Sequence, residues 1–252
     1  MQKKIIAKKK YGQNFLTNKN ILTEIIEHIN FNPQYNFLEI GPGYGALTEK
    51  LIQKTNKLTL VEIDEDCIFM LKKIIVNETE IIHKDILSIE ESNLIKYDVI
   101  IGNLPYYIST EIIFKFLKIF NVKEMYFMLQ KEVGERLLAS PGKSNNSILT
   151  NLVKFYFDSE VVCNVSAECF NPVPKVNSIF IKLKRHSRYI NSIEYDKFKL
   201  LVKSAFQFKR KNLKNNLKDI LPNFDFEKLQ INSSDRAEDL TIENFIELSR
   251  QI

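Results

Sequence analysis

The chain has 252 residues, of which 44% are hydrophobic and 27% are charged, and its formal net charge is +5. The length allows one large domain plus a small one, and the composition fits a globular protein better than a fibrous or disordered one. No apolar run approaches the ~20 residues that span a bilayer, and the basic start MQKKIIAKKK lacks the apolar stretch of a secretory signal, so we expect a cytoplasmic protein without a membrane segment.

Apolar residues recur at helical spacing between Ile21 and Ile29, and Thr17 or Asn18 is available to cap that helix. Strand-like and helix-like segments then alternate. The expected strands are 36–40, 57–63, 79–85, 97–101 and 124–129, and helices are expected at 46–54, 65–76 and 109–120. This alternation predicts the α/β class, with a Rossmann-like, doubly wound and mostly parallel sheet.

The pattern changes after Pro141. Residues 159–165 and 177–186 are strand-like without a clear helix between them, which predicts an antiparallel edge to the sheet. Beyond Ser187 the chain is predicted to form only short helices. We therefore expect two domains, 1–188 with the sheet and a basic N-terminal arm, and a small all-helical domain at 189–252.

Cysteine and histidine, which often bind metals or take part in nucleophilic catalysis, are rare in this chain. The three cysteines have no C-x-x-C spacing, and the three histidines have no i, i+4 pair. These spacings predict no disulfide framework, no metal site and no Ser-His or Cys-His nucleophile. We therefore expect the reactive group to come from an organic cofactor.

Two basic segments contain no acid. Residues 1–20 hold six lysines, and residues 197–218 hold eight lysines and arginines. Such segments indicate a polyanionic partner, with nucleic acid the first candidate. The alternative is that a lysine-rich composition alone produces them.

Glycine is scarce, yet three of the seven glycines lie within five residues, at Gly41, Gly43 and Gly45 in LEIGPGYG. They fall at a strand-to-helix junction, where a glycine backbone can turn tightly and approach a ligand closely. The spacing is G-x-G-x-G rather than the G-x-G-x-x-G of dinucleotide enzymes. A loop that uses glycine for its own geometry is the alternative.

Acids follow the next two predicted strands. Glu62 comes 21 residues after Gly41, where a carboxylate in this fold can accept hydrogen bonds from both ribose hydroxyls. Asp85 ends the strand after that, where its side chain could reach an adenine, although it could also be an ordinary surface acid. Together these strand ends predict a nucleoside pocket at the carboxyl edge of the sheet.

The fourth strand end carries GNLPYY, residues 102–107. Methyl transfer from a sulfonium donor to an aromatic amine needs no ionised base, but the amine lone pair must be turned toward the methyl group. The Asn103 side-chain oxygen and a backbone carbonyl near Leu104 could accept the two amine hydrogens. Pro105 fixes the loop, and Tyr106 offers a ring face to the base. A proline turn with packed tyrosines is the alternative.

Seven segments in consistent order resemble the ribosomal RNA adenine dimethyltransferases of the KsgA type. The segments are GQNFL (12–16), LEIGPGYGALT (38–48), VEID (61–64), NLPYYIST (103–110), MLQKEV (128–133), PVPKVNS (172–178) and RAEDLT (236–241). The resemblance runs from about residue 8 to the C-terminus.

The resemblance implies that S-adenosylmethionine is the cofactor and that the small ribosomal subunit is the partner. Members of the family dimethylate the N6 amines of two adjacent adenosines in the 3′-terminal hairpin of 16S rRNA. The cofactor contacts that it implies, including those already proposed from the strand ends, are Gln13, Asn14, Leu16, Gly41, Gly43, Glu62, Asp85 and Asn103, of which Gln13 is the weakest. A role in small-subunit biogenesis is also implied.

Further expectations concern the RNA. Phe170 matches an aromatic that faces the target adenine, although a core phenylalanine is the alternative. The helical domain is expected to bind RNA through Lys209, Arg210 and Lys211, in a run with fewer arginines than the family usually has. Tyr107 stands where the family often has Asn. No heptad seam or large apolar stripe is apparent, so we expect a monomer.

Other functions remain open at this point. The related large-subunit methylases that confer antibiotic resistance share PKVNS and carry NIPY, whereas NLPY, MLQKEV and RAEDLT are typical of small-subunit enzymes. A DNA adenine methylase usually has a second proline in its target motif. A non-catalytic assembly factor would be expected to carry a lesion in the glycine loop, Glu62 or NLPY, and no such lesion is present.

Overall fold

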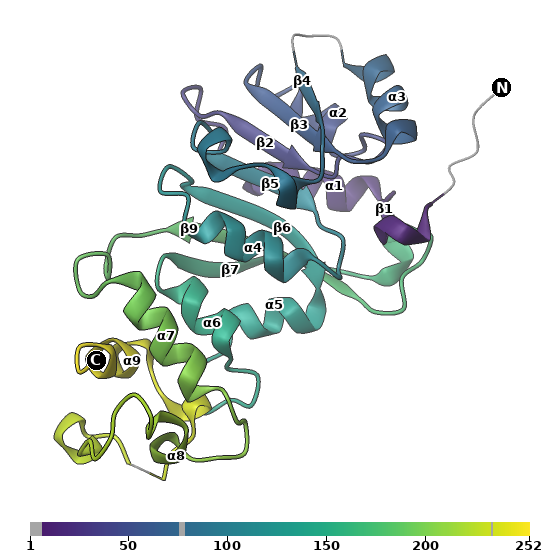
Figure 1. Cartoon of the computed structure of the whole chain (residues 1–252). Helices are drawn as coiled ribbons and strands as arrows, with labels where there is room; N and C mark the ends of the chain where they lie inside the picture. Colours follow the sequence, from purple (N-terminus) through teal and green to yellow (C-terminus); the bar gives the residue numbers. More distant parts are fainter. Residues whose placement is uncertain (1–6, 76–78, 233) are drawn as a thin grey trace. The chain divides into compact units, whose positions relative to one another are not determined.

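The computed structural model describes residues 7–75, 79–232 and 234–252 (Figure 1). The first six residues of the predicted basic arm, including Lys3 and Lys4, lie outside the described part. The chain forms two compact units, which we call the sheet unit (1–134 and 160–184) and the helical unit (135–159 and 185–252). Residues 135–159 thus group with the C-terminal segment, whereas the sequence-based boundary at 188 and 189 places them with the sheet.

The main sheet has seven strands among the described residues. In spatial order they are β4 (Glu80–His83), β3 (Leu58–Glu62), β2 (Phe37–Ile40), β5 (Val99–Asn103), β6 (Glu124–Gln130), β9 (Ser178–Arg185) and β7 (Phe157–Val165). The first five run parallel to one another, and β9 pairs antiparallel with β6. The doubly wound, mostly parallel sheet predicted from the sequence is therefore confirmed.

The chain order of the strands reverses at the middle of the sheet. From β2 the chain moves outward through β3 and β4, and it then returns to the other side of β2 to form β5 and β6. In open α/β sheets ligands bind at such a reversal, in the crevice outside the carboxyl ends of the strands. The crevice between β2 and β5 is therefore the expected binding position.

Helices and single 3-10 turns precede and connect the strands of the main sheet. The helices are α1 (Lys19–His28), α2 (Thr48–Leu51), α3 (Glu65–Ile74), α4 (Ser109–Leu117) and α5 (Lys131–Leu137), and the turns are η1 (Lys9–Tyr11), η2 (Ile86–Ser88), η3 (Glu91–Asn93) and η4 (Ala167–Cys169). Asn18 caps α1 by accepting hydrogen bonds from the backbone N–H groups of Asn20 and Ile21. The predicted helix 46–54 is shorter than expected, because the N–H groups of Lys54 and Thr55 both bond to the Leu51 carbonyl and close a turn there.

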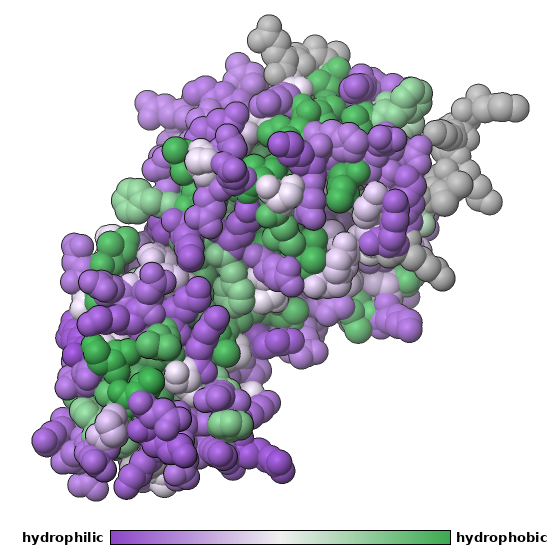
Figure 2. All heavy atoms as spheres, in the orientation of Figure 1, coloured by the Kyte–Doolittle hydropathy of each residue, from purple (hydrophilic) through white to green (hydrophobic). Residues whose placement is uncertain are grey.

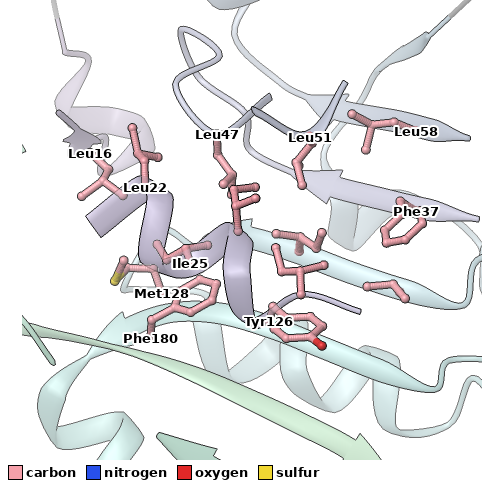
Figure 3. Close-up of a cluster of buried hydrophobic side chains, with 14 of the residues drawn as sticks. Leu16, Leu22, Ile25, Phe37, Leu47, Leu51, Leu58, Tyr126, Met128 and Phe180 are labelled. Carbon is pink, nitrogen blue, oxygen red and sulfur yellow. The ribbon is translucent and has the colours of Figure 1, made fainter. Parts of the chain in front are cut away.

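Both faces of the sheet are buried. Successive residues of a strand point to opposite faces, and Val99, Ile100 and Ile101 of β5 are all fully buried. One face carries a large apolar cluster, in which Figure 3 shows Ile25 of α1 beside Met128 of β6 and Phe180 of β9. Packing of this kind makes the central strands a rigid base for the loops at their carboxyl ends.

A small second sheet joins distant parts of the sequence. Strand β1 (Phe15–Leu16) pairs antiparallel with β8 (Phe170–Asn171), so that Leu16 lies opposite Phe170. The Thr17 N–H also donates to the Cys169 carbonyl at 2.8 Å. This pairing holds the N-terminal segment in place beside the sheet.

The helical unit is built around α7. Its helices are α6 (Ile148–Lys154), α7 (Tyr195–Ala205), α8 (Leu213–Leu217) and α9 (Ile242–Ser249), with 3-10 turns η5 (Phe226–Leu229) and η6 (Ala237–Asp239). Helix α7 packs against the other three and buries Phe198 and Leu201 among them.

The described surface is largely polar. On the face that Figure 2 shows, hydrophilic residues predominate and apolar residues gather in smaller patches. No helix within the described ranges is long and apolar enough to cross a membrane.

Candidate active site

A pocket lies at the carboxyl ends of the parallel strands, where the strand order reverses. Its empty space amounts to about 810 Å³, counting the open solvent at its mouth. The predicted site residues that line it are Gln13, Asn14, Gly41, Gly43, Glu62, Asp85, Asn103, Leu104, Pro105 and Tyr106. The structure thus brings the four strand ends and the GQNFL segment to a single cavity.

Gly41 and Gly43, in the loop after β2, are each required for a different structural reason. Gly41 has φ +63°, and a Cβ atom built on it would meet nothing within 4 Å. Because Gly41 lines the pocket, its bare backbone leaves room for a ligand to approach closely. Gly43 has φ +57°, and a Cβ atom there would lie 2.8 Å from the Phe15 ring, so this glycine makes room for the N-terminal segment.

The Glu62 carboxylate is held by backbone donors. Its Oε2 accepts a bond from the Gly43 N–H at 2.9 Å, and its Oε1 accepts bonds from the N–H groups of Ile63 and Asp64. Burial raises the pKa of Glu62, although the three donors oppose that shift. A carboxylate has about four acceptor positions, so one remains for a hydroxyl of a bound ligand.

Asp85 is more exposed and less constrained. It caps η2, with its Oδ1 accepting a bond from the Leu87 N–H at 2.9 Å. Its other oxygen has no hydrogen-bond partner in the described part of the chain, so Asp85 can accept a bond from a ligand at the pocket wall.

Gln13 is occupied by contacts within the protein. Its Nε2 donates to Asp64 at 2.8 Å, and its Oε1 accepts a bond from the Lys8 N–H at 2.8 Å. The Lys8 ammonium also lies 2.5 Å from Asp64 and 2.7 Å from Asp66. Gln13 therefore fastens the N-terminal segment against the loop after β3. It also lines the pocket, so its predicted cofactor contact stays a prediction.

The amide of Asn103 is oriented by the same N-terminal segment. Its Nδ2 donates to the Asn14 carbonyl at 2.7 Å. The Oδ1 atom is then left without a hydrogen-bond partner among the described residues, and Asn103 lines the pocket. The Leu104 carbonyl has none among those residues either, whereas the carbonyls of Pro105 and Tyr106 accept bonds from Ile108 and Ser109. Two acceptors, Asn103 Oδ1 and Leu104 O, are thus available for an amine.

Tyr106 is fixed at both ends. Its carbonyl accepts the Ser109 hydroxyl bond, and its phenol oxygen lies 2.6 Å from Ser178 Oγ. Ser178 is fully buried at the start of β9, where it lies opposite Gln130 of β6. Burial raises the pKa of Tyr106, so the phenol stays protonated. The ring at the pocket wall is therefore held in a single orientation.

A second, smaller cavity adjoins the first. It encloses about 480 Å³ and shares Phe15, Gly41 and Asn103 with the larger pocket. Leu16, which does not line the larger pocket, lines this one. Glu39 lines it as well. Its Oε2 atom accepts a 2.7 Å bond from the Thr48 hydroxyl, and burial raises the pKa of the Glu39 carboxyl group to about 8.

Phe170 is not brought to either cavity. Its side chain is 2% exposed and belongs to the apolar cluster beneath the sheet. The cause is the pairing of β8 with β1, which turns Phe170 toward the core beside Leu16. In this structure its ring therefore has no face open to a base.

The three predicted RNA contacts belong to the helical unit. Lys209, Arg210 and Lys211 are all exposed in the loop between α7 and α8. Among the described residues no group of three His, Cys, Asp or Glu side chains is placed to hold a metal ion.

Sequence reasoning missed several residues of the site, three of which make contacts that can be described. Phe15, whose ring lies 4.7 Å from that of Tyr44, lines both cavities, Ser178 holds Tyr106, and Glu39 lies buried beside the glycine loop. Each stands inside one of the motifs GQNFL, PVPKVNS and LEIGPGYG. Their positions within motifs therefore indicated that these residues matter, but the sequence did not indicate which contacts they make.

Known proteins resemble this chain along nearly all of its length. The sequence profile of the ribosomal RNA adenine dimethylase family matches residues 5–252. The ribosomal RNA small subunit methyltransferase A of Fusobacterium nucleatum is 42% identical over 254 residues, covering 96% of each chain. That of Buchnera aphidicola is 38% identical, covering 99% of this chain and 94% of the relative.

Solved structures of two proteins are also similar to this chain along nearly all of its length. A dimethyladenosine transferase from Plasmodium falciparum superposes with a TM-score of 0.82 at 31% identity, covering 92% of this chain and 95% of that one. The 23S rRNA methyltransferase ErmE shares the fold, with a TM-score of 0.75 at 22% identity and coverage of 94% and 99%.

Proposed function

Because the chain belongs to the ribosomal RNA adenine dimethylase family, we propose that it transfers methyl groups from S-adenosylmethionine to adenosines of ribosomal RNA. The substrate that we assign is the pair of adjacent adenosines in the 3′-terminal hairpin of small-subunit 16S rRNA, dimethylated at N6. Relatives named small subunit methyltransferase A support that choice over a large-subunit substrate. We further propose that the protein acts in the cytoplasm, as a monomer, in small-subunit biogenesis.

The residues of the pocket fit the proposed cofactor. Gly41 leaves its side-chain position empty at the pocket wall, and Glu62 keeps an acceptor position for a ribose hydroxyl. One carboxylate oxygen of Asp85 has no partner among the described residues and can accept a bond from the adenine, and Leu16 lines the adjoining cavity. When bound, S-adenosylmethionine supplies a methyl group already activated by its sulfonium centre.

The observation that carries the proposed reaction is the orientation of Asn103. Its amide nitrogen is tied to the Asn14 carbonyl, so its Oδ1 is the atom available to the pocket. An adenine amine that donates one hydrogen to Asn103 Oδ1 and the other to Leu104 O loses conjugation with the ring and turns its lone pair outward. A neutral amide accepts this bond without the desolvation cost of a carboxylate.

The base is held by Tyr106. A flipped adenine costs a few kcal/mol to unstack, and stacking on an aromatic ring offsets roughly 1–3 kcal/mol of that cost. The Ser178 contact keeps the Tyr106 ring in place before the base arrives. The ring of Phe170 is buried. It can stack on the other face of the adenine only if β8 shifts.

The RNA is bound in part outside the pocket. We propose that residues 1–188 form the methyltransferase domain and that 189–252 contact the RNA, with Lys209, Arg210 and Lys211 on phosphates. Their exposure and the absence of acids from 197–218 support this assignment.

The test is transfer of labelled methyl groups to unmethylated small subunits, to large subunits and to free rRNA, with the modified nucleoside identified. N6-dimethyladenosine formed only in small-subunit RNA is the expected result. Label confined to large-subunit RNA would overturn the substrate assignment. Cofactor binding without transfer to any RNA would instead make the chain an assembly factor without catalytic activity.

A further inference from the structure

The loop between α7 and α8, residues 206–212, carries an exposed aromatic ring next to three cations. The Phe208 side chain is 47% exposed, and Lys209, Arg210 and Lys211 follow it directly on the surface. We propose that this loop binds an unpaired nucleotide of the RNA, with its base stacked on Phe208 and the flanking phosphates on the three cations. The inference rests on the proposed function, because it takes RNA as the partner.

The loop is held in one conformation by a buried side chain. Asn216 of α8 is nearly inaccessible, and its Nδ2 donates to the carbonyls of Ala205 at 2.7 Å and Phe208 at 3.2 Å. Its Oδ1 accepts a bond from the Phe208 N–H at 3.2 Å. The Lys211 N–H also donates to the Phe208 carbonyl at 3.0 Å. Both polar ends of the Asn216 amide are thus used to fix the backbone that presents the ring.

The ring is placed where a cation and a base can share it. The Lys211 ammonium lies 4.1 Å from the centroid of Phe208, within the distance of a cation–π contact. Single-stranded nucleic acids are bound by this combination, in which aromatic rings stack on bases and neighbouring cations follow the backbone. In a continuous A-form duplex the base faces are already stacked, so the loop fits an unpaired nucleotide.

The charge around the loop favours a polyanion over an apolar protein surface. From Lys197 to Lys218 the chain has eight basic residues and no acid. A protein partner would have to bring several carboxylates to match them, whereas one strand of RNA supplies a phosphate at each nucleotide. The ring within this basic segment then adds contact with the base to a phosphate site.

The experiment measures fluorescence anisotropy of the full-length protein with two labelled RNAs of equal phosphate count, one single-stranded and one fully paired. Phe208→Ala should weaken binding of the single strand roughly 5- to 150-fold, the equivalent of removing one stacked base. Binding of the duplex and the salt dependence with either RNA should stay as in the wild type. Phe208→Trp keeps a ring face and should retain the affinity.

Leu200→Ala is the matched control, because Leu200 is a similarly exposed apolar residue of the neighbouring α7, at 51% exposure. It should leave both affinities unchanged. Equal affinities of the wild type and Phe208→Ala for the single strand, or equal losses with both RNAs, would overturn the stacking while leaving the proposed methyl transfer intact. If the wild type bound neither RNA and transferred no methyl group to small ribosomal subunits, the proposed function itself would fail.

Discussion

The contribution of the Tyr106–Ser178 contact to stability can be measured by a double-mutant cycle. The two hydroxyl oxygens lie 2.6 Å apart, and Ser178 is fully buried. Tyr106→Phe leaves the serine hydroxyl buried without a partner, which should cost about 1–3 kcal/mol of unfolding free energy. Ser178→Ala removes the partner of the phenol, and because Tyr106 is only partly buried we expect a smaller cost of about 0.5–1.5 kcal/mol.

The double variant has no orphaned hydroxyl, so its loss should be smaller than the sum of the single losses. We expect a coupling of about 1 kcal/mol, measured by urea unfolding of all four proteins. Tyr107→Phe is the control, because the neighbouring Tyr107 side chain is 62% exposed and its change should be silent. If the losses of unfolding free energy in the two single variants simply added up in the double variant, the hydrogen bond would not be a stabilising contact.

The same variants test whether the contact positions the ring. Ser178→Ala should lower kcat for RNA methylation while the Kd for S-adenosylmethionine stays near the wild-type value, because Ser178 lines neither cavity. Ser178→Thr, which keeps the hydroxyl, should retain more of kcat. Loss of cofactor affinity in Ser178→Ala would mean that the residue supports the pocket in general.

Three further predictions concern other parts of the chain. Gly43→Ala should weaken cofactor binding measured by calorimetry, because its Cβ would lie 2.8 Å from the Phe15 ring at a positive φ, and unchanged binding would show that the N-terminal segment moves freely. Burial raises the pKa of Glu39 from 4.5 to about 8, so folding takes up a proton between these values and wild-type stability should fall as pH rises from 4.5 to 8, by up to ~1.4 kcal/mol per pH unit. Glu39→Gln should flatten that dependence in urea unfolding, and equal slopes would mean that Glu39 is ionised in the fold. Replacing Lys209, Arg210 and Lys211 by Ala should reduce the log-log salt slope of RNA binding by roughly 0.7–0.9 for each phosphate that the variant no longer neutralises, and an unchanged slope would mean that these three side chains do not bind the RNA.

The fold was largely predictable because the sheet unit obeys simple patterns. Short apolar runs alternate with amphipathic segments, and the ends of four successive parallel strands meet at one edge. Glu62, Asp85 and Asn103 could therefore be placed together before any coordinates were known, and all three line the same pocket. The glycine loop belonged to the same edge for the same reason.

What could not be predicted depends on contacts between distant residues. Strand β1 has only two residues, and its partner Phe170–Asn171 lies more than 150 positions away, so no local pattern indicates the pair. That pairing decides that Phe170 is buried. The hydrogen bonds of Gln13 with Asp64 and Lys8 were likewise not indicated by its motif. Specific hydrogen bonds of this kind produce no periodic pattern from which the sequence could predict them.

The proposed mechanism depends on Asn103 acting on the acceptor amine while Glu62 and the glycine loop hold the cofactor. The most direct test is the Kd for S-adenosylmethionine by calorimetry and the single-turnover rate of methyl transfer to small subunits, measured for Asn103→Ala and Glu62→Gln. Asn103→Ala should lose rate at nearly unchanged Kd, and Glu62→Gln should lose mainly affinity. Equal losses of rate and affinity in Asn103→Ala would contradict this mechanism and make Asn103 chiefly a cofactor ligand.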